Sequence, residues 1–357
     1  MKIGVITLPF SPNYGWLLQA YALQQTLIKN GHDAILISRR WNIVEKNNSL
    51  FMKIMRPFYY NVNCGCIYRF YKKHIKTTKV YRDSDALRTV IQEYKLDAVI
   101  VGSDQVWRIE DTRGVGYNFF LDFANDNVLK MSYAASYGTD EWKGTENDNK
   151  IIKNLLNSFS GISVREESGI DICSKYFNKK AVNVLDPTLL LHSEDYDKVL
   201  NRPNLYVDKN ILATYILDPT PQKDNFVNRI ANAKNLSVDP LYVTTRSRFH
   251  IYKSVENWLL KIRNSKFVIV DSFHGMVFCI IFKKQFLAIA NKNRGYTRFI
   301  SLLKLLGIEN RLVYNMDDVD YKVSESVINY DKVDSFLEIH RQESLQYLLN
   351  TLNKSKL

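Results

Sequence analysis

Short apolar runs alternate with amphipathic segments from the start of the chain. Residues 2–8 (KIGVITL) are apolar and rich in β-branched side chains, as expected for a strand that is buried on both faces, and a loop follows at 9–15. Apolar positions at helical spacing run through 16–30, Gly31 ends that helix, and 33–38 (DAILIS) predicts the next strand. This order predicts two parallel strands joined by a crossover helix.

The same rhythm continues along the chain in two series. A strand followed by a sharp polar turn recurs in DAVIVGSDQVW, MSYAASYG, GISVREESG and AVNVLDPTLLL. A second series begins near residue 205, with strands predicted in NILATYIL, LYVTT, KFVIVDS and QFLAIA. Repeated alternation of strands and helices is typical of doubly wound parallel sheets. We therefore predict an α/β fold with two Rossmann-like domains facing a central cleft.

The length of 357 residues also favours two domains, because it is long for a single hydrophobic core. We place an N-terminal Rossmann-like domain at 1–195 and a C-terminal one at 205–330. The remainder, 331–357, has the pattern of an amphipathic helix.

The formal net charge of +12 is concentrated in a basic aromatic insertion at about 39–82. The segment contains many lysines and arginines but a single acidic residue, Glu45, and aromatic residues are interleaved with the basic ones. This pattern favours an anionic partner, such as a phosphorylated acceptor or a membrane surface, and a solvated basic face is the alternative. No zinc-finger, RNA-recognition or helix-turn-helix signature accompanies the insertion, so we do not expect nucleic acid as a partner.

Several functional classes are disfavoured by what the sequence lacks. The first apolar stretch is too short for a signal peptide, and no stretch approaches the roughly 18 apolar residues of a membrane span. We expect a cytoplasmic protein, with peripheral contact at the inner leaflet as an option. The cysteines are too scattered for a disulfide framework, and Cys64-Gly65-Cys66 lacks a second pair at ligand spacing, so we expect no metal site.

A polar turn at 271–275 (DSFHG) interrupts an apolar run between the strand FVIV and the helix MVFCIIF. In a parallel sheet such a turn lies at the carboxyl end of a strand, where ligands bind, and the following helix start favours an anion. Imidazole changes protonation near neutral pH, so His274 is a candidate general acid or base. A structural histidine beside apolar neighbours is the alternative.

Five segments taken together carry a resemblance to a known family: NYGWLLQAYALQ, VGSDQVW, SVREESG, VLDPTLLL, and DSFHG followed by NRG. Their order and wording resemble the polysaccharide pyruvyl transferase family from about residue 3 to about residue 312. One departure is Trp16, because the family usually has a small residue after NYG. The resemblance implies a fold like that of the two-Rossmann (GT-B) glycosyltransferases. It also implies transfer of a pyruvyl group from phosphoenolpyruvate to a sugar as a ketal, in capsular, exopolysaccharide or cell-wall polysaccharide synthesis.

The resemblance and the chemistry together assign roles to the polar turns. Ketal formation needs a proton carrier and cations for the carboxylate and the phosphate, so we predict His274, Arg165 and Asp104 as catalytic residues. The C-terminal domain is expected on the donor side and the N-terminal domain on the acceptor side. The predicted donor-binding residues are Arg165, Ser272, Phe273, His274, Gly275, Lys292 and Arg294, and the predicted acceptor-binding residues are Asn13, Tyr14, Gly15, Gly102, Ser103 and Asp104.

Structural alternatives stand beside these roles. Arg165 is also placed to form a salt bridge with one of the two acids that follow it, and Asp104 to cap the next helix. The cations at 292–294 also suit a solvated loop, and Asp186-Pro187 suits a structural turn.

The predicted partners are phosphoenolpyruvate, as co-substrate, and a nucleotide- or lipid-linked sugar. The cations suffice to stabilise a leaving phosphate, so no cofactor or metal is required. Two alternatives remain open: a glycosyltransferase of the same architecture that uses a nucleotide sugar, and a non-catalytic member that binds anionic glycans or the membrane through the basic face.

Overall fold

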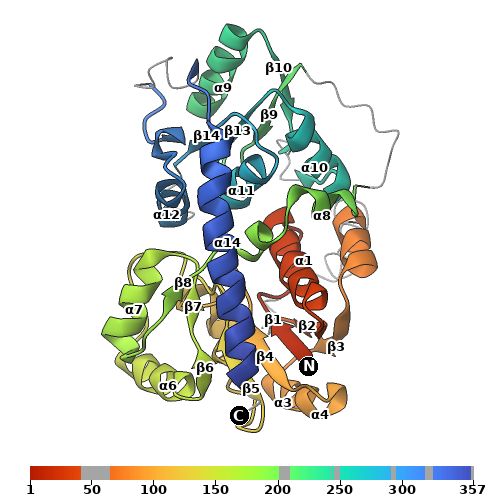
Figure 1. The fold of residues 1–357 in the computed structure, drawn as a ribbon, viewed down its shortest axis with the longest axis vertical. Helices are drawn as coiled ribbons and strands as arrows, with labels where there is room; N and C mark the ends of the chain where they lie inside the picture. The colour runs from red at the N-terminus through yellow and green to blue at the C-terminus, as the bar shows by residue number, and fades with distance from the viewer. Residues whose placement is uncertain are drawn as a thin grey trace, which may run out of the picture. The chain divides into compact units, whose positions relative to one another are not determined.

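The chain forms two compact units, each built on its own parallel sheet (Figure 1). Unit 1 comprises 1–49, 71–190 and 338–357, and unit 2 comprises 50–70 and 191–337. The computed structural model describes residues 1–41, 65–200, 210–241, 243–244, 250–290, 295–317 and 325–354.

The sheet of unit 1 has six parallel strands in the order β3-β2-β1-β4-β5-β6. The order reverses between β1 and β4, whose register pairs Ile6 with Val101. Strand β4 (AVIV) is buried at every position, as expected for a parallel strand covered on both faces. The strands are β1 Lys2–Ile6, β2 Asp33–Arg39, β3 Thr77–Tyr81, β4 Ala98–Val101, β5 Leu129–Ser132 and β6 Phe159–Gly161, followed by a separate parallel pair, β7 Ser163–Val164 and β8 Val182–Asn183.

Helix α1 shows how the sequence sets its own boundaries. The Asn13 side chain accepts from the N–H groups of Gly15 at 2.8 Å and Trp16 at 3.1 Å, which caps the first turn. Past its other end Gly31 has a φ of +81°, which suits glycine. The helices of unit 1 include α1 Tyr14–Lys29, α3 Ser84–Arg88, α4 Val90–Tyr94, α5 Ile109–Thr112, α6 Glu146–Leu156 and α7 Glu167–Phe177, with 3₁₀ turns at Arg113–Val115, Asn118–Phe120 and Pro187–Leu190.

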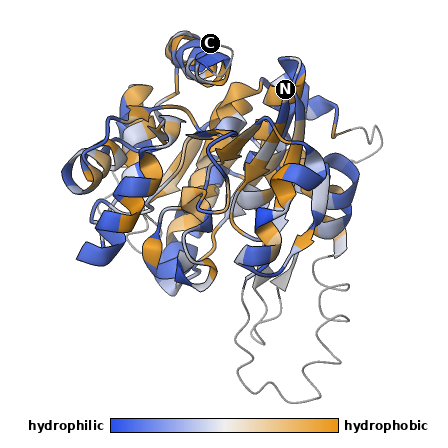
Figure 2. Ribbon diagram, turned by 90° about the horizontal axis from the view of Figure 1, so that it is seen from below, coloured by the Kyte–Doolittle hydropathy of each residue, from blue (hydrophilic) through white to orange (hydrophobic). Residues whose placement is uncertain are grey.

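The sheet of unit 2 has five parallel strands in the order β10-β9-β13-β14-β15, and this order reverses between β9 and β13. Helix α11 is buried at all nine positions, so it is a core helix of this unit. Figure 2 shows hydrophobic residues on the strands and hydrophilic residues on the outer helix faces. The strands are β9 Ile211–Tyr215, β10 Ser237–Pro240, β13 Phe267–Val270, β14 Phe286–Ile289 and β15 Leu312–Val313, and β11 Val243–Thr244 pairs antiparallel with β12 His250–Ile251.

The remaining helices follow the predicted alternation. The long helix α14 contributes residues to unit 2 before 338 and to unit 1 from there on. None of the described helices is both long and apolar enough to cross a membrane. The helices are α8 Ser193–Asp197, α9 Pro221–Lys234, α10 Val255–Asn264, α11 Phe273–Ile281, α12 Thr297–Leu305 and α14 Tyr330–Asn353, with a 3₁₀ turn at Glu309–Arg311.

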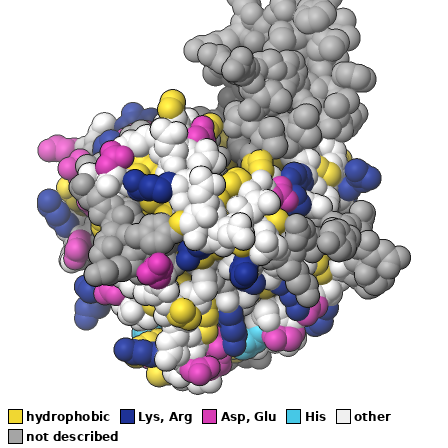
Figure 3. Space-filling model, turned by 90° about the horizontal axis from the view of Figure 1, so that it is seen from above, with side chains coloured by type: hydrophobic (Ala, Val, Ile, Leu, Met, Phe, Trp, Pro, Cys, Tyr) yellow, Lys and Arg dark blue, Asp and Glu magenta, His cyan; other side chains and the backbone are white. Residues whose placement is uncertain are grey.

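In the described part of the basic insertion, several cationic side chains are buried or form ion pairs within unit 1, so the segment does not present one continuous basic surface. Arg39 is buried, and its guanidinium donates to Asn118 Oδ1 at 2.9 Å and to the carbonyl oxygen of Arg82 at 2.7 Å. Lys76 and Lys79 form ion pairs with acidic side chains at 2.6 and 2.7 Å. On the face drawn in Figure 3, lysines and arginines are interspersed with aspartates and glutamates. Arg39 therefore stabilises the packing of unit 1. Its inclusion in the predicted partner-binding segment is wrong, because its side chain is buried.

Candidate active site

The predicted acceptor residues follow two neighbouring strands of unit 1. Residues 13–15 come after β1 and residues 102–104 after β4, so both segments lie at the edge where the strand order reverses. Thr7 Oγ1 donates to the carbonyl oxygen of Ser103 at 2.7 Å and ties the two strand ends together. Open parallel sheets bind their ligands at such an edge. The structure thus brings the two predicted acceptor segments to one edge, and their contact with an acceptor stays a prediction.

Arg165 lies in a buried polar network at the same carboxyl edge. Its side chain is 2% exposed, and Nη1 donates to Asp186 Oδ2 at 2.6 Å and to Ser103 Oγ at 3.1 Å. Ser103 Oγ in turn donates to Asp186 Oδ2 at 2.9 Å, and Arg165 Nη2 lies 4.0 Å from Asp104 Oδ1. The segments that follow β4, β7 and β8 are thereby joined through one guanidinium.

The charge of Arg165 is held by its neighbours. Burial acts to lower the pKa of Arg165, but the carboxylates of Asp186, Asp104 and Glu166 offset it, and the pKa is raised. We expected Arg165 to form a salt bridge with Glu166 or Glu167 as the structural alternative. The salt bridge is present, but its partner is Asp186. Asp186 also forms the predicted turn, since its Oδ1 accepts from the backbone N–H of Thr188 at 3.0 Å.

Asp104 has a strained backbone at the end of β4. Its φ of 92° lies in a region that residues other than glycine rarely adopt, and such outliers cluster at functional sites. Its Oδ1 accepts from the N–H of Gln105 at 2.9 Å, and its carbonyl oxygen accepts from Ser136 N at 3.0 Å. The next helix, α5, begins after Arg108, so the alternative that Asp104 caps a helix is wrong.

Glu166 has a role that the sequence did not reveal. Its buried Oε1 accepts from Tyr137 N at 2.7 Å, from Ser136 Oγ at 3.0 Å and from Gly138 N at 3.3 Å. This carboxylate fixes the turn after β5, which in turn bonds to the backbone of Asp104. The adjacent charges in SVREESG signalled a polar site, but not which partner each charge would take.

His274 occupies the first turn of α11, which is separated from the end of β13 by two residues, beside the reversal of the unit 2 sheet. It is 7% exposed, and its ring packs edge to face on Phe273 with centroids 5.4 Å apart. The guanidinium of Arg298 lies 5.3 Å from the centre of the Phe273 ring, a cation that no motif had marked. The hydroxyl of Ser272, at the N-cap position, makes no capping hydrogen bond among the described residues.

Gly275 allows α11 to pack closely on the sheet. A Cβ at this position would lie 2.9 Å from Tyr215 Cδ1 and 3.1 Å from Val270 Cγ1. This packing role is new, and the predicted donor contact of Gly275 stays a prediction.

Gly275→Ala is therefore expected to lower the free energy of unfolding by about 1–3 kcal/mol, because the added methyl overpacks the core of unit 2. Urea denaturation measures this change. Gly114→Ala is the control, since a Cβ there meets nothing within 4 Å. Equal stability of the two variants would contradict the packing role.

Trp16, the departure from the family pattern, is buried at the start of α1. Its indole Nε1 donates to the carbonyl oxygen of Leu8 at 2.7 Å, and its ring packs against Phe10 and Tyr71 with centroids 5.3 and 5.9 Å away. The indole thus stiffens the loop between β1 and α1 from within unit 1.

Two predicted donor residues, Lys292 and Arg294, lie outside the described residues.

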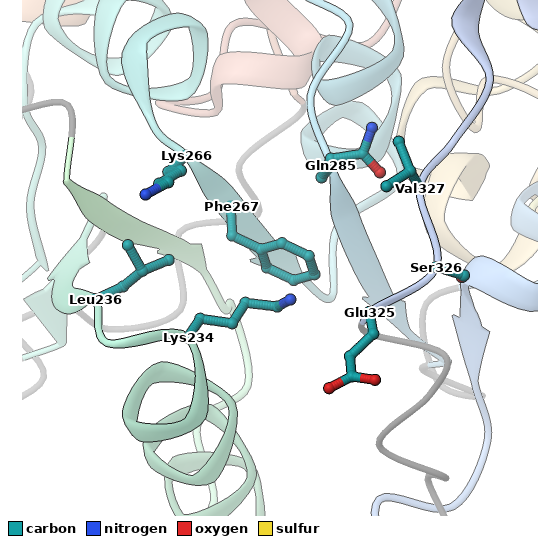
Figure 4. Close-up of a pocket in the computed structure, with 8 residues that line it drawn as sticks. All are labelled: Lys234, Leu236, Lys266, Phe267, Gln285, Glu325, Ser326 and Val327. Atoms are coloured by element: carbon teal, nitrogen blue, oxygen red, sulfur yellow. The ribbon is translucent and has the colours of Figure 1, made fainter.

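A cavity of about 270 Å³ in unit 2 lies away from these motifs (Figure 4). Phe267, in its lining, is the first residue of β13, and Gln285 directly precedes β14, so the cavity is at the amino ends of these strands. His274 follows the opposite, carboxyl end of β13. The cavity is lined by Lys234, Leu236, Lys266, Phe267, Gln285, Glu325, Ser326 and Val327.

Solved structures share this architecture. The chain is similar to UDP-N-acetylglucosamine 2-epimerase from Rickettsia bellii, with 9% identity, a TM-score of 0.54 and coverage of 99% of this chain and 97% of that chain. The UDP-GlcNAc 2-epimerase from Neisseria meningitidis bound to UDP-GlcNAc is 10% identical, with a TM-score of 0.53 and coverage of 99% of this chain and 100% of that chain. UGT71G1 from Medicago truncatula complexed with UDP-glucose is 10% identical, with a TM-score of 0.50 and coverage of 99% of this chain and 98% of that chain. This likeness is one of fold, and it confirms the predicted α/β class with two Rossmann-like domains of GT-B type.

The sequence places the chain more narrowly within that class. No curated protein matches it, but the family model for polysaccharide pyruvyl transferase matches residues 13–293. The chain belongs to the polysaccharide pyruvyl transferase family, as its five motifs predicted. The family implies a transferase with a sugar or polysaccharide acceptor.

Proposed function

We propose that this chain moves the enolpyruvyl group of phosphoenolpyruvate onto a sugar and forms a pyruvate ketal, in the synthesis of a capsular, extracellular or cell-wall polysaccharide. The observation that carries the proposal is the family match, which spans the motifs of both units up to residue 293. The motifs that follow β1 and β4 in unit 1 and β13 in unit 2 lie at the carboxyl edge of a parallel sheet, beside the reversal of strand order.

The reaction balances with these residue types alone. One sugar hydroxyl adds to C2 of the enol while C3 takes a proton. The bond between C2 and the phosphate oxygen then breaks, and a second hydroxyl of the same sugar adds to C2. Of the two hydroxyl protons, one appears on C3 and one leaves with phosphate, so no oxidant or reductant is needed. His274 is the proposed proton carrier, and its first-turn position in α11 favours an anionic donor.

In unit 1 we assign complementary roles to Asp104 and Arg165. Asp104 accepts a proton or a hydrogen bond from the sugar, which suits a carboxylate that is 17% exposed on a strained strand end. Arg165 already holds Asp186 with Nη1, so its proposed role toward the donor anion is that of a fixed cation, and it also keeps Ser103 in place.

The proposed acceptor is a nucleotide-linked or lipid-linked sugar, since both carry phosphate. Lys72 and Lys73 are exposed and offer cations for such a phosphate or for the inner leaflet of the membrane. Peripheral membrane contact predicts binding to vesicles with anionic lipid and loss of that binding in Lys72→Glu/Lys73→Glu. Equal binding to neutral vesicles would refute it.

The first experiment measures thermal stability with millimolar phosphoenolpyruvate, against phosphate, pyruvate, and uridine and cytidine nucleotides. A ligand at about 100 times its dissociation constant adds about 2.7 kcal/mol. Selective stabilisation by phosphoenolpyruvate is expected, with a smaller shift in His274→Ala and Arg165→Lys, each compared with its own ligand-free midpoint. Stabilisation by nucleotides alone would favour a glycosyltransferase, a candidate supported by the fold shared with UGT71G1 complexed with UDP-glucose.

A further inference from the structure

A buried ion pair lies at the point where the strand order of unit 2 reverses. Asp271 directly follows β13 and is 0% exposed, and Lys223, in the first turn of α9, is 8% exposed. Lys223 Nζ lies 2.7 Å from Asp271 Oδ2. The two residues come from the turns after neighbouring strands, because β9 and β13 pair along their length.

The contacts of the Asp271 carboxylate join these two turns. Oδ1 accepts from Leu217 N at 2.7 Å, and Oδ2 accepts from Asp218 N at 3.2 Å as well as from Lys223. Lys223 Nζ also donates to the carbonyl oxygen of Asp218 at 2.8 Å, and Asp271 N donates to Tyr215 O at 3.1 Å. The segment between β9 and α9 is therefore held by its backbone to the residue that precedes the turn of His274.

The pair breaks two local rules, which makes a purely stabilising role a poor explanation. Lysine is among the residues least often buried, and a cation in the first turn of a helix opposes the helix dipole. A buried ion pair is also often no more stable than apolar side chains of the same volume. Departures from local preference are expected where a site must be held in place.

We propose that Asp271 and Lys223 are positioning residues for His274, and that the turn at 216–220 lines the same donor site. This inference rests on the proposed function and adds to it a segment that none of the family motifs contains. Asp271 fixes the backbone three residues before His274, and Lys223 fixes the turn after β9 against it. The geometry at the reaction centre then depends on a pair that does not itself touch the donor.

Lys223→Met is the test, and Lys223→Arg is the conservative variant that keeps the charge. In Lys223→Met, the phosphoenolpyruvate concentration for half-maximal stabilisation is expected to rise by about tenfold or more, because a small misplacement of binding groups is costly. Lys223→Arg should recover most of that loss. Arg311→Met is the matched control, since Arg311 is a buried cation of unit 2 that directly precedes β15, at the end of the sheet away from the site, and donates to the carbonyl oxygen of Ser326. It should lower the melting temperature and leave the phosphoenolpyruvate response unchanged.

Hydrogen exchange provides a second reading that needs no ligand. In Lys223→Met, the amides of 216–222 and of 271–275 should both exchange about tenfold faster, while those of 286–289 keep their rate. If phosphoenolpyruvate does not stabilise the wild-type protein, the proposed function is overturned. The hydrogen-exchange pattern would still decide whether the Asp271–Lys223 pair couples the turns at 216–222 and 271–275. A wild-type response to phosphoenolpyruvate in Lys223→Met, with unchanged exchange at 271–275, would overturn this inference. If Lys223→Met fails to fold, Asp271→Asn carries the same readings.

Discussion

His274→Ala is expected to lower the rate of ketal formation by about 10²–10⁴-fold, the usual contribution of a positioned general acid or base. The reaction moves one proton to C3 of the enol and takes two from sugar hydroxyls, and alanine carries none. Binding should change less than turnover, because backbone N–H groups at the start of α11 remain. Phosphate release from phosphoenolpyruvate, with the acceptor sugar that supports the fastest release, measures the effect.

His274→Gln is the control for packing, because His274 is 7% exposed and alanine would leave a gap beside Phe273. Glutamine fills much of the space and hydrogen-bonds, but it does not exchange a proton near neutral pH. Both variants should therefore lose activity, and glutamine should keep the wild-type melting temperature more closely. A glutamine variant with more than about a tenth of the wild-type rate would remove His274 from proton transfer.

Much of the fold could be predicted because burial leaves a clear mark on sequence. The runs AVIV in β4 and FVIV in β13 are buried at every position, and both were expected as strands. Strand β10 could not be predicted in this way, since SVDP is polar and largely exposed. It pairs with β9 at the edge of the sheet, where only one neighbour and little burial are required.

The sequence predicted that the candidate residues lie at strand ends, but it did not predict which side chains would contact one another. Sequence placed Arg165 and Asp104 at strand ends, and the structure brings them within 4.0 Å of each other. Which acid would hold Arg165 depends on the segment after β8 lying beside the end of β4, and no spacing along the chain records that. Lys223 was missed for the same reason, because it looks like a solvated helix charge and its partner is Asp271, 48 residues away.

Asp186→Ala is expected to lower the free energy of unfolding by about 3–5 kcal/mol, the usual cost of leaving a buried charge without its partner. The Arg165 side chain is 2% exposed and would lose its 2.6 Å contact, and the backbone N–H of Thr188 would lose its acceptor. For a domain of this size the melting temperature falls by about 2–4 °C per kcal/mol, so a drop of about 6–20 °C is expected. Calorimetry measures it.

Two comparisons separate the buried charge from the loss of a contact. Lys79→Ala removes the ion pair between Lys79 and Glu93. The Lys79 side chain is 60% exposed, so the free energy of unfolding should fall by less than about 1 kcal/mol. Arg165→Met/Asp186→Leu removes both buried charges and should be more stable than Asp186→Ala alone, because no uncompensated cation remains. If Asp186→Ala instead unfolds within about 1 kcal/mol of the wild type, water or another acid must reach Arg165.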